Sequence, residues 1–323
     1  MTDSTPAEPD PTQPGATQPD ATQLDRYNET AQAAAAAVIG RYPTSFSAAT
    51  NLLGKRCRPA IRNVYALVRV ADEIVDGVAE AAGVDASGQR VELDALEAET
   101  LQAMQSGFSS NLVVHAFAQT ARACGIDADV VRPFFASMRM DIAAQYGGEL
   151  NLDAAEHEVY VYGSAQVVGL MCVRVFSRYQ LARRPNAATA ALLDDAGKAL
   201  GSAFQNVNFL RDLADDTHRL QRSYLADGAT RLDEGAKLDW VARIREDLAL
   251  AEVGINLLPR DCRAGVRVAH ALFSELNDRV EVTSVEDLYR ERVSVPSAVK
   301  ARIIASIVMK EDPWRRPWSS VRA

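Results

Sequence analysis

The chain has 323 residues, of which 48% are apolar and 24% are charged, the balance of a globular protein with a large core. Five acidic residues and no lysine or arginine fall within residues 1–25, so the rest of the chain carries 38 acids against 35 bases. A nearly neutral body without a Lys- or Arg-rich run excludes the usual nucleic-acid-binding proteins.

The sequence contains no run of 18 consecutive apolar residues and no apolar signal segment at its N-terminus. We therefore expect no membrane-spanning helix and a cytoplasmic location. The four cysteines lack the CxxC spacing of zinc sites, which agrees with a reducing compartment. They are Cys57, Cys124, Cys172 and Cys262.

Residues 1–24 contain five of the 13 prolines and a loose Thr-Gln-Pro repeat. Such a segment buries too little apolar surface to offset the entropy of ordering, so we predict a disordered tail. Residues 25–310 include long stretches without proline that are rich in Ala, Leu, Arg and Glu and lack the alternation of strands, which predicts a single all-α domain. Residues 311–323 form a second, C-terminal tail. Helix breaks are predicted at 83–88, 105–110, 146–151 and 183–186.

The most informative segment is N-V-Y-A-L-V-R-V-A-D-E-I-V-D-G, residues 63–77. At 100° per residue, one face of this helix carries four polar side chains, and the other faces are apolar. An acidic stripe exposed to solvent is one interpretation. The apolar surroundings favour the other, in which buried carboxylates are paired or bind a metal. The four residues are Tyr65, Arg69, Asp72 and Asp76.

A second segment, A-F-Q-N-V-N-F-L-R-D-L-A-D-D at 203–216, repeats this pattern. Its single polar stripe lies on an otherwise apolar helix. If the two helices face each other across a cavity, their oxygens form a site for Mg²⁺ or Mn²⁺, which is normally shared with substrate phosphates. Arginines on both stripes would bind the phosphate oxygens. The second stripe consists of Gln205, Asn208, Arg211, Asp212 and Asp216.

These segments resemble the two aspartate-rich motifs of the squalene/phytoene synthases, DxxxD and NxxRDxxxD. They stand here as D-E-I-V-D (72–76) and N-F-L-R-D-L-A-D-D (208–216). Further matches follow in the same order over about residues 42–300. They are Y-P-T-S-F-S (42–47), R-x-x-I-x-x-x-Y-A-x-x-R (58–69), M-R-M-D-I (138–142), Y-V-Y-G-S-A-Q-V-V-G-L-M (160–171) and R-V-S-V-P (292–296).

The resemblance implies the type I isoprenoid synthase fold, an all-α bundle around a deep apolar cavity. It implies metal ligands at Asp72, Asp76, Asn208, Asp212 and Asp216. It implies substrate contacts at Ser45, Tyr65, Arg69, Gln205, Arg211 and Tyr224. The four aspartates of the motifs, with Arg69 and Arg211, are then the catalytic set. Asp141 either supports this site or packs between helices.

The implied reaction joins two prenyl diphosphates head-to-head. We expect the phytoene branch, in which two geranylgeranyl diphosphates form prephytoene diphosphate and then phytoene, with Mg²⁺ and without NADPH. The nearest alternative is a squalene or dehydrosqualene synthase that uses farnesyl diphosphate. Gln166 stands where many relatives have a glycine that permits close packing, which leaves the prenyl chain length open. A terpene cyclase and a non-catalytic helical assembly factor are weaker alternatives, because the second motif differs from that of cyclases and all its acids are present.

The C-terminal segment M-K-E-D-P-W-R-R-P-W-S-S-V-R-A, residues 309–323, places Trp314 and Trp318 beside two arginines. Tryptophan prefers the headgroup region of a bilayer and arginine is attracted to anionic lipid, so this tail predicts peripheral contact with the inner face of the membrane. Burial of both tryptophans on the helical body is the alternative. No sequence feature indicates an oligomeric state.

Overall fold

The computed structural model describes residues 21–41, 45–147, 150–179, 185–214, 222–225 and 231–311. Within these ranges the chain is a helical bundle with two strands of two residues each, so the all-α prediction is confirmed. The first half contains α1 (Ala21–Arg41), α2 (Ser45–Asn51), α3 (Arg58–Asp76), α4 (Val78–Ala81), α5 (Ala86–Ser106), α6 (Leu112–Cys124) and α7 (Ala128–Gly147).

The second half begins with α8 (Ala154–Val161), a π-helical turn η1 (Tyr162–Gln166) and α9 (Val167–Arg178), which run on as one helix. The remaining helices are α10 (Ala187–Arg211), α12 (Glu234–Leu257), α13 (Arg260–Val282), α14 (Val285–Leu288) and α15 (Ser297–Glu311). The strands β1 (Leu150–Asn151) and β2 (Arg222–Ser223) pair in parallel.

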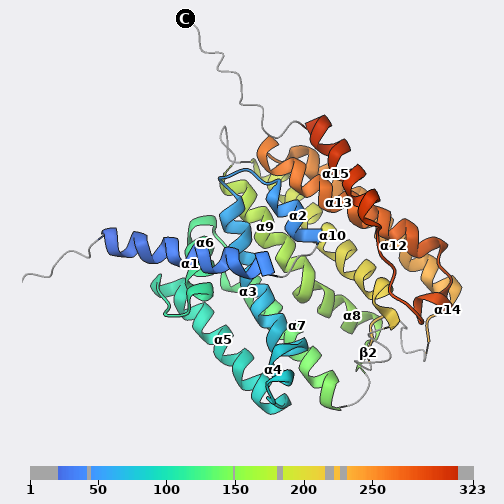
Figure 1. The fold of residues 1–323 in the computed structure, drawn as a ribbon, viewed down its shortest axis with the longest axis horizontal. Helices are drawn as coiled ribbons and strands as arrows, with labels where there is room; N and C mark the ends of the chain where they lie inside the picture. The colour runs from blue at the N-terminus through green and yellow to red at the C-terminus, as the bar shows by residue number, and fades with distance from the viewer. Residues whose placement is uncertain are drawn as a thin grey trace, which may run out of the picture.

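The helices are arranged in layers around α3, α9 and α10 (Figure 1). Helices α5, α6 and α7 contact α3 on one side, and α12 and α13 contact α10 on the other, with α15 packed on α13. Helix α1 lies across α3 and α6. It begins at Ala21, inside the segment that the composition assigned to the N-terminal tail.

Local signals explain where several helices begin and end. Asp85 accepts a hydrogen bond from the Gly88 N–H at the start of α5, and Gly107 ends that helix with a φ of 83°, which favours glycine. Asp153 and Glu156 form a reciprocal capping box at the start of α8. Asn186 caps α10. Asp85, Gly107 and Asn186 lie at predicted breaks, because such caps are local in sequence, whereas the capping box of α8 begins two residues after the predicted break at 146–151.

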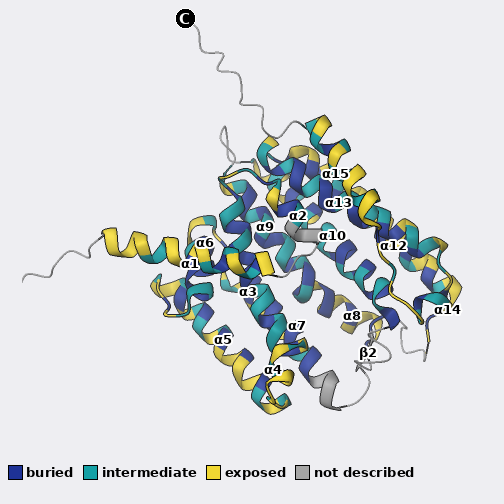
Figure 2. Cartoon of the chain, in the orientation of Figure 1, coloured by how far each residue is buried: buried dark blue, intermediate teal, exposed yellow. Residues whose placement is uncertain are grey.

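Two apolar cores lie on either side of the central helices. One joins α3, α5, α6, α7 and α9, and the other joins α8, α10, α12, α13 and α15. Figure 2 shows that exposed residues gather on the outward faces of α1 and α5, whereas α9 and α10 are mostly covered. The bundle therefore holds a sheltered space between its two cores.

Helices α9 and α10 approach each other closely through glycines. A Cβ on Gly169 would collide with the Gly197 carbonyl, and one on Gly201 would lie 2.5 Å from the Ala165 carbonyl. Gln166, which stands in place of the common glycine, donates a hydrogen bond from Nε2 to Ser202 Oγ at 2.8 Å. The close contact thus persists on both sides of Gln166, whose own side chain ties the two helices together.

In the described residues, one helical stretch is long and apolar enough to cross a membrane by length and composition alone. It is Ala154–Arg178, and half of its apolar window is buried inside the protein. Core helices of folded bundles have the same properties. Polar residues such as Ser164, Gln166 and Arg174 interrupt this stretch, so it contains no run of 18 consecutive apolar residues.

Candidate active site

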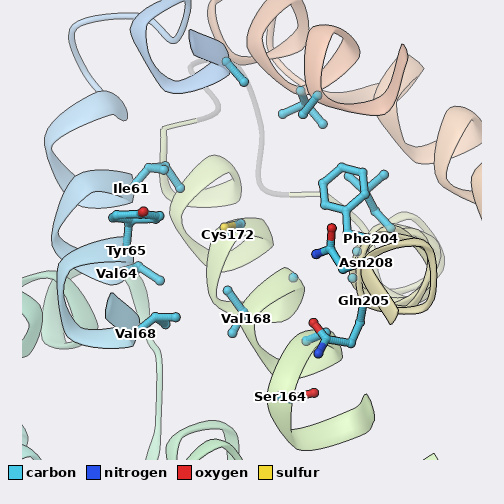
Figure 3. Close-up of a pocket in the computed structure, with 18 of the residues that line it drawn as sticks. Ile61, Val64, Tyr65, Val68, Ser164, Val168, Cys172, Phe204, Gln205 and Asn208 are labelled. Carbon is cyan, nitrogen blue, oxygen red and sulfur yellow. The ribbon is translucent and has the colours of Figure 1, made fainter. Parts of the chain in front are cut away.

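A cavity of about 590 Å³ lies between the two cores. This volume is in the range of ligand sites, which span about 300–1,000 Å³. Figure 3 looks into it: Ile61, Tyr65 and Val68 reach in from α3, and Phe204, Gln205 and Asn208 face them from α10. Most of the lining is apolar, and the charged side chains gather at one end. The deep apolar cavity expected for this fold class is therefore present.

The charged end of the cavity is formed by the C-terminal ends of two helices. Asp76 is the last residue of α3, and Asp212 follows the last residue of α10. A helix C-terminus already carries a partial negative charge, so a carboxylate there is unfavourable unless a cation neutralises it. Two such ends at one cavity mouth make a site that attracts cations.

Asp72 lies one turn before Asp76 and lines the same cavity. Burial within the protein and the nearby charge of Asp76 raise its pKa from 3.8 to about 8, although Arg69 acts in the opposite direction. Asp141 and Glu73 add further repulsion. In the absence of a cation this carboxyl group therefore keeps its proton at neutral pH.

Asp212 is neutralised by arginines. Arg211 Nε donates to its Oδ1 at 2.9 Å while the second guanidinium nitrogen reaches Oδ2, and Arg292 also pairs with Oδ1. On α3, Arg69 pairs with Glu73. Arg292 was not predicted as a site residue, since it lies 80 residues after Asp212 and only the fold brings the two together. Its motif, R-V-S-V-P, was the available signal.

Most of the other predicted substrate-contacting residues lie on the wall of the cavity. Tyr65, Gln205 and Arg211 line the cavity. Tyr224 also lines it, but its hydroxyl donates to Asp141 Oδ1 at 3.0 Å. Ser45 begins α2 and its side chain lies outside the described structure, as does Asp216. The structure therefore brings together every predicted site residue whose side chain it describes, and their roles stay predictions.

The residues at the mouth fit a divalent cation. Asp72 is a crowded carboxyl, and the buried Oδ1 of Asn208 accepts no hydrogen bond from the part of the chain that the structure describes. Hard cations such as Mg²⁺ take oxygen ligands and complete their shell with water and substrate phosphate. The described residues hold no group of three or more His, Cys, Asp or Glu side chains arranged for a metal.

The sequence of this chain matches one protein family over most of its length. The model of the squalene/phytoene synthase family matches residues 39–298. Phytoene synthase 3 of Zea mays is 29% identical over 279 residues, covering 81% of this chain and 62% of the maize protein. A 15-cis-phytoene synthase of Paracoccus sp. is 27% identical over 302 residues, covering 84% of this chain and 93% of that protein.

Solved structures with the same fold are more distant in sequence. A dehydrosqualene synthase in complex with a ligand superposes with a TM-score of 0.70 at 18% identity, covering 90% of this chain and 99% of that chain. A squalene synthase from Alicyclobacillus acidocaldarius superposes with a TM-score of 0.63 at 17% identity, covering 85% and 98%. At these identities the likeness concerns the fold.

Proposed function

This chain belongs to the squalene/phytoene synthase family and is a prenyltransferase of that family, and we propose that it is a phytoene synthase. In this proposal two geranylgeranyl diphosphates condense to prephytoene diphosphate with release of one diphosphate and a proton. Prephytoene diphosphate then loses its own diphosphate, rearranges and loses a second proton to give phytoene. The observation that carries the proposal is an apolar cavity with charged side chains at the acid- and arginine-bearing ends of α3 and α10. The names of the curated relatives in maize and Paracoccus support the choice of product.

The length of the cavity supports a C20 chain. The lining follows α10 from Asn208 at the charged end to Leu193 at the other. Fifteen residues at a rise of 1.5 Å make about 22 Å. An extended chain of carbon–carbon bonds advances about 1.25 Å per bond, so the fifteen main-chain bonds of a geranylgeranyl group span about 19 Å. A farnesyl group, with eleven such bonds, spans about 14 Å and would leave the far end unfilled.

At the charged end, the proposed roles follow from the chemistry of the side chains. Asp72, Asp76, Asn208 and Asp212, with Asp216 from the second motif, would hold Mg²⁺. When bound, the metal neutralises the diphosphate and stabilises its departure. Arg69 and Arg211 bind diphosphate oxygens in a bidentate manner, for which a guanidinium is suited. Tyr65 and Gln205 provide further polar groups around the departing diphosphate.

The apolar part of the cavity has a different task. Loss of diphosphate leaves an allylic cation at C1 of one substrate, and the C2–C3 double bond of the second attacks that carbon. A proton is then lost and the cyclopropane ring closes. Water would capture the cation, so the aliphatic and aromatic lining must exclude it. Val68, Val168 and Phe204 form this lining next to the charged end.

One experiment tests the proposal directly. The purified full chain is incubated with Mg²⁺ and either farnesyl or geranylgeranyl diphosphate, with and without NADPH, and the extracted hydrocarbons are identified by mass spectrometry. The matched control is Asp76→Asn, which removes one predicted ligand with little change in side-chain volume. A C40 hydrocarbon from geranylgeranyl diphosphate without NADPH, absent in the control, is the expected result.

Two outcomes would contradict the proposal in informative ways. A C30 product from farnesyl diphosphate, with geranylgeranyl diphosphate a poor substrate, would assign the chain to the squalene or dehydrosqualene branch. NADPH would then distinguish these two, because only squalene formation consumes a reductant. Full turnover in EDTA would contradict the assignment of the metal ligands.

A further inference from the structure

A carboxylate outside the two aspartate motifs lies beside the cavity. Asp141 belongs to α7 and is only 2% exposed. Its Oδ2 accepts a hydrogen bond from the Tyr160 hydroxyl at 2.8 Å, and its Oδ1 accepts one from the Tyr224 hydroxyl at 3.0 Å. Both carboxylate oxygens are therefore engaged by phenols that come from distant parts of the chain.

The two phenols sit on a wall of the cavity. Tyr160, Tyr224, Phe209 and Asp141 all line it. The ring of Tyr224 stacks on Phe209 at 4.1 Å between centroids with an interplanar angle of 13°, and it lies 5.2 Å from the ring of Tyr160. Phe209 follows Asn208 directly in the chain, so this aromatic wall adjoins the proposed metal site.

The surrounding backbone fixes Tyr160 relative to Asp141. Ser137, one turn before Asp141 on α7, donates a hydrogen bond from Oγ to the Tyr160 carbonyl at 3.1 Å. Three residues after Tyr160, Gly163 lies so close to α7 that a Cβ there would collide with the Pro133 carbonyl. One face of α7 thus holds both the backbone and the hydroxyl of Tyr160.

Tyr224 depends on Asp141 in a different way. It follows the short strand β2, whose pairing with β1 brings residues 222–225 next to the start of α8. Two residue pairs in parallel register give little stability by themselves. A charge-assisted hydrogen bond to a buried carboxylate is stronger than a neutral one and ties this segment, which follows the second motif, to α7.

We propose that Asp141 is a positioning residue: it orients the hydroxyls and rings of Tyr160 and Tyr224 at the reacting end of the cavity and is not itself a metal ligand. Burial and the charge of Asp141 raise the pKa of the Tyr160 phenol, so Tyr160 stays protonated and remains a donor. Since the aromatic wall borders the charged end rather than the distal part of the cavity, its misplacement should lower kcat more than it raises KM.

The test compares Asp141→Asn, Tyr160→Phe, Tyr224→Phe and their double mutants with the wild type. It rests on the proposed function for its substrate, and it also includes melting temperature, which needs no turnover. We expect each variant to lower kcat by about 10- to 100-fold, the range for loss of a hydrogen bond to a charged group. We expect Asp141→Asn combined with Tyr160→Phe to lose much less than the product of the single effects, in kcat and in melting temperature alike.

The control is Tyr289→Phe, which removes a hydroxyl that accepts a hydrogen bond from the Leu232 N–H at 3.0 Å, away from the cavity. It should leave kcat unchanged. Normal kcat in all three site variants would overturn the proposal, as would additive losses in the double mutants. A steep rise in the Mg²⁺ requirement of Asp141→Asn alone, with both tyrosine variants normal, would make Asp141 a metal ligand instead.

Two further outcomes also bear on the role of Asp141. If Asp141→Asn fails to fold, the two tyrosine variants and their double mutant still measure whether the phenols act on kcat. If the wild type forms no hydrocarbon from either prenyl diphosphate, the proposed function fails. The melting temperatures of the double mutants then decide independently of the proposed function: non-additive changes support the Asp141 network and additive changes overturn it.

Discussion

Replacing Asp72 with asparagine in the metal-free protein should stabilise it, by an amount that depends on pH. The pKa of Asp72 is raised from 3.8 to about 8, chiefly by burial and by Asp76. Below pH 4 both the folded and the unfolded chain hold this proton, so the substitution has little effect. Between pH 4 and pH 8 only the folded chain holds it, so the stability of the wild type falls as pH rises. Above pH 8 the difference is constant.

The magnitude follows from the size of the pKa shift. One unit corresponds to 1.36 kcal/mol, so Asp72 destabilises the metal-free protein by at most about 4 kcal/mol at pH 7 and about 6 kcal/mol above pH 8. Asp72 is only partly buried, so solvent screens its charge and we expect about half of these values. Asparagine has nearly the same shape and no charge. Asp72→Asn should therefore raise the melting temperature at pH 7 by several degrees, about 4–8 °C.

The assay is thermal unfolding in EDTA from pH 4 to pH 9. The control is Asp239→Asn, which changes an exposed carboxylate on α12. A parallel series contains Mg²⁺ and inorganic diphosphate, which should stabilise the wild type and not the Asp72 variant. A variant that melts at or below the wild-type temperature at every pH, or a gain that does not change with pH, would refute the description of Asp72 as a crowded carboxyl with a raised pKa.

Four further expectations can be measured on the same protein. Arg69→Lys and Arg211→Lys should each lower kcat at least tenfold in the hydrocarbon assay, because an ammonium does not reproduce bidentate diphosphate binding; wild-type rates in both would leave these arginines as counter-ions only. Cys172→Phe should favour farnesyl over geranylgeranyl diphosphate in competition assays, with Cys172→Ser as control. Cys172 and Phe176 both line the cavity from α9, so the new ring fills it one helical turn, about 5.4 Å, before Phe176, and an isoprene unit spans about 5 Å. Gly169→Ala should cost about 1–3 kcal/mol in denaturant unfolding, since the added methyl collides with a carbonyl of α10; unchanged stability would contradict the close contact of α9 and α10. Deleting residues 312–323, which lie outside the described structure, should weaken sedimentation with anionic liposomes if the tail contacts membranes, and equal binding would exclude it as the anchor.

The sequence predicted the parts of the site that lie on one helix face. Helical periodicity placed Arg69 and Asp72 together, and Asn208 and Arg211 together, because residues three and four apart share a face whatever the tertiary fold. It also predicted the helical class and several helix ends, since caps are local. That the two stripes meet at one cavity was a condition of the metal-site prediction, and periodicity alone could not establish it.

Contacts between distant segments could not be predicted in this way. The pairing of Arg292 with Asp212 and that of Tyr160 and Tyr224 with Asp141 join residues that no local period relates. Gln166 is a second example of a contact that the local sequence does not predict. Its place at a position where many relatives have glycine left the shape of the cavity open, and the structure shows that neighbouring glycines keep α9 and α10 close while Ser202 accepts its hydrogen bond. The effect of one residue on packing depends on which partners the fold supplies.

The site balances its acidic charge in two different ways when no cation is bound. On α10, Asp212 is neutralised by the guanidinium groups of Arg211 and Arg292. On α3, Arg69 pairs with Glu73, and Asp72 is neutralised by a proton instead. Mg²⁺ and diphosphate compete with both arrangements, since the cation replaces the proton and the diphosphate attracts the arginines. Before substrate arrives, the arginines thus offset the charge of Asp212 and a proton offsets that of Asp72, so neither group is left as an unpaired charge in an apolar cavity.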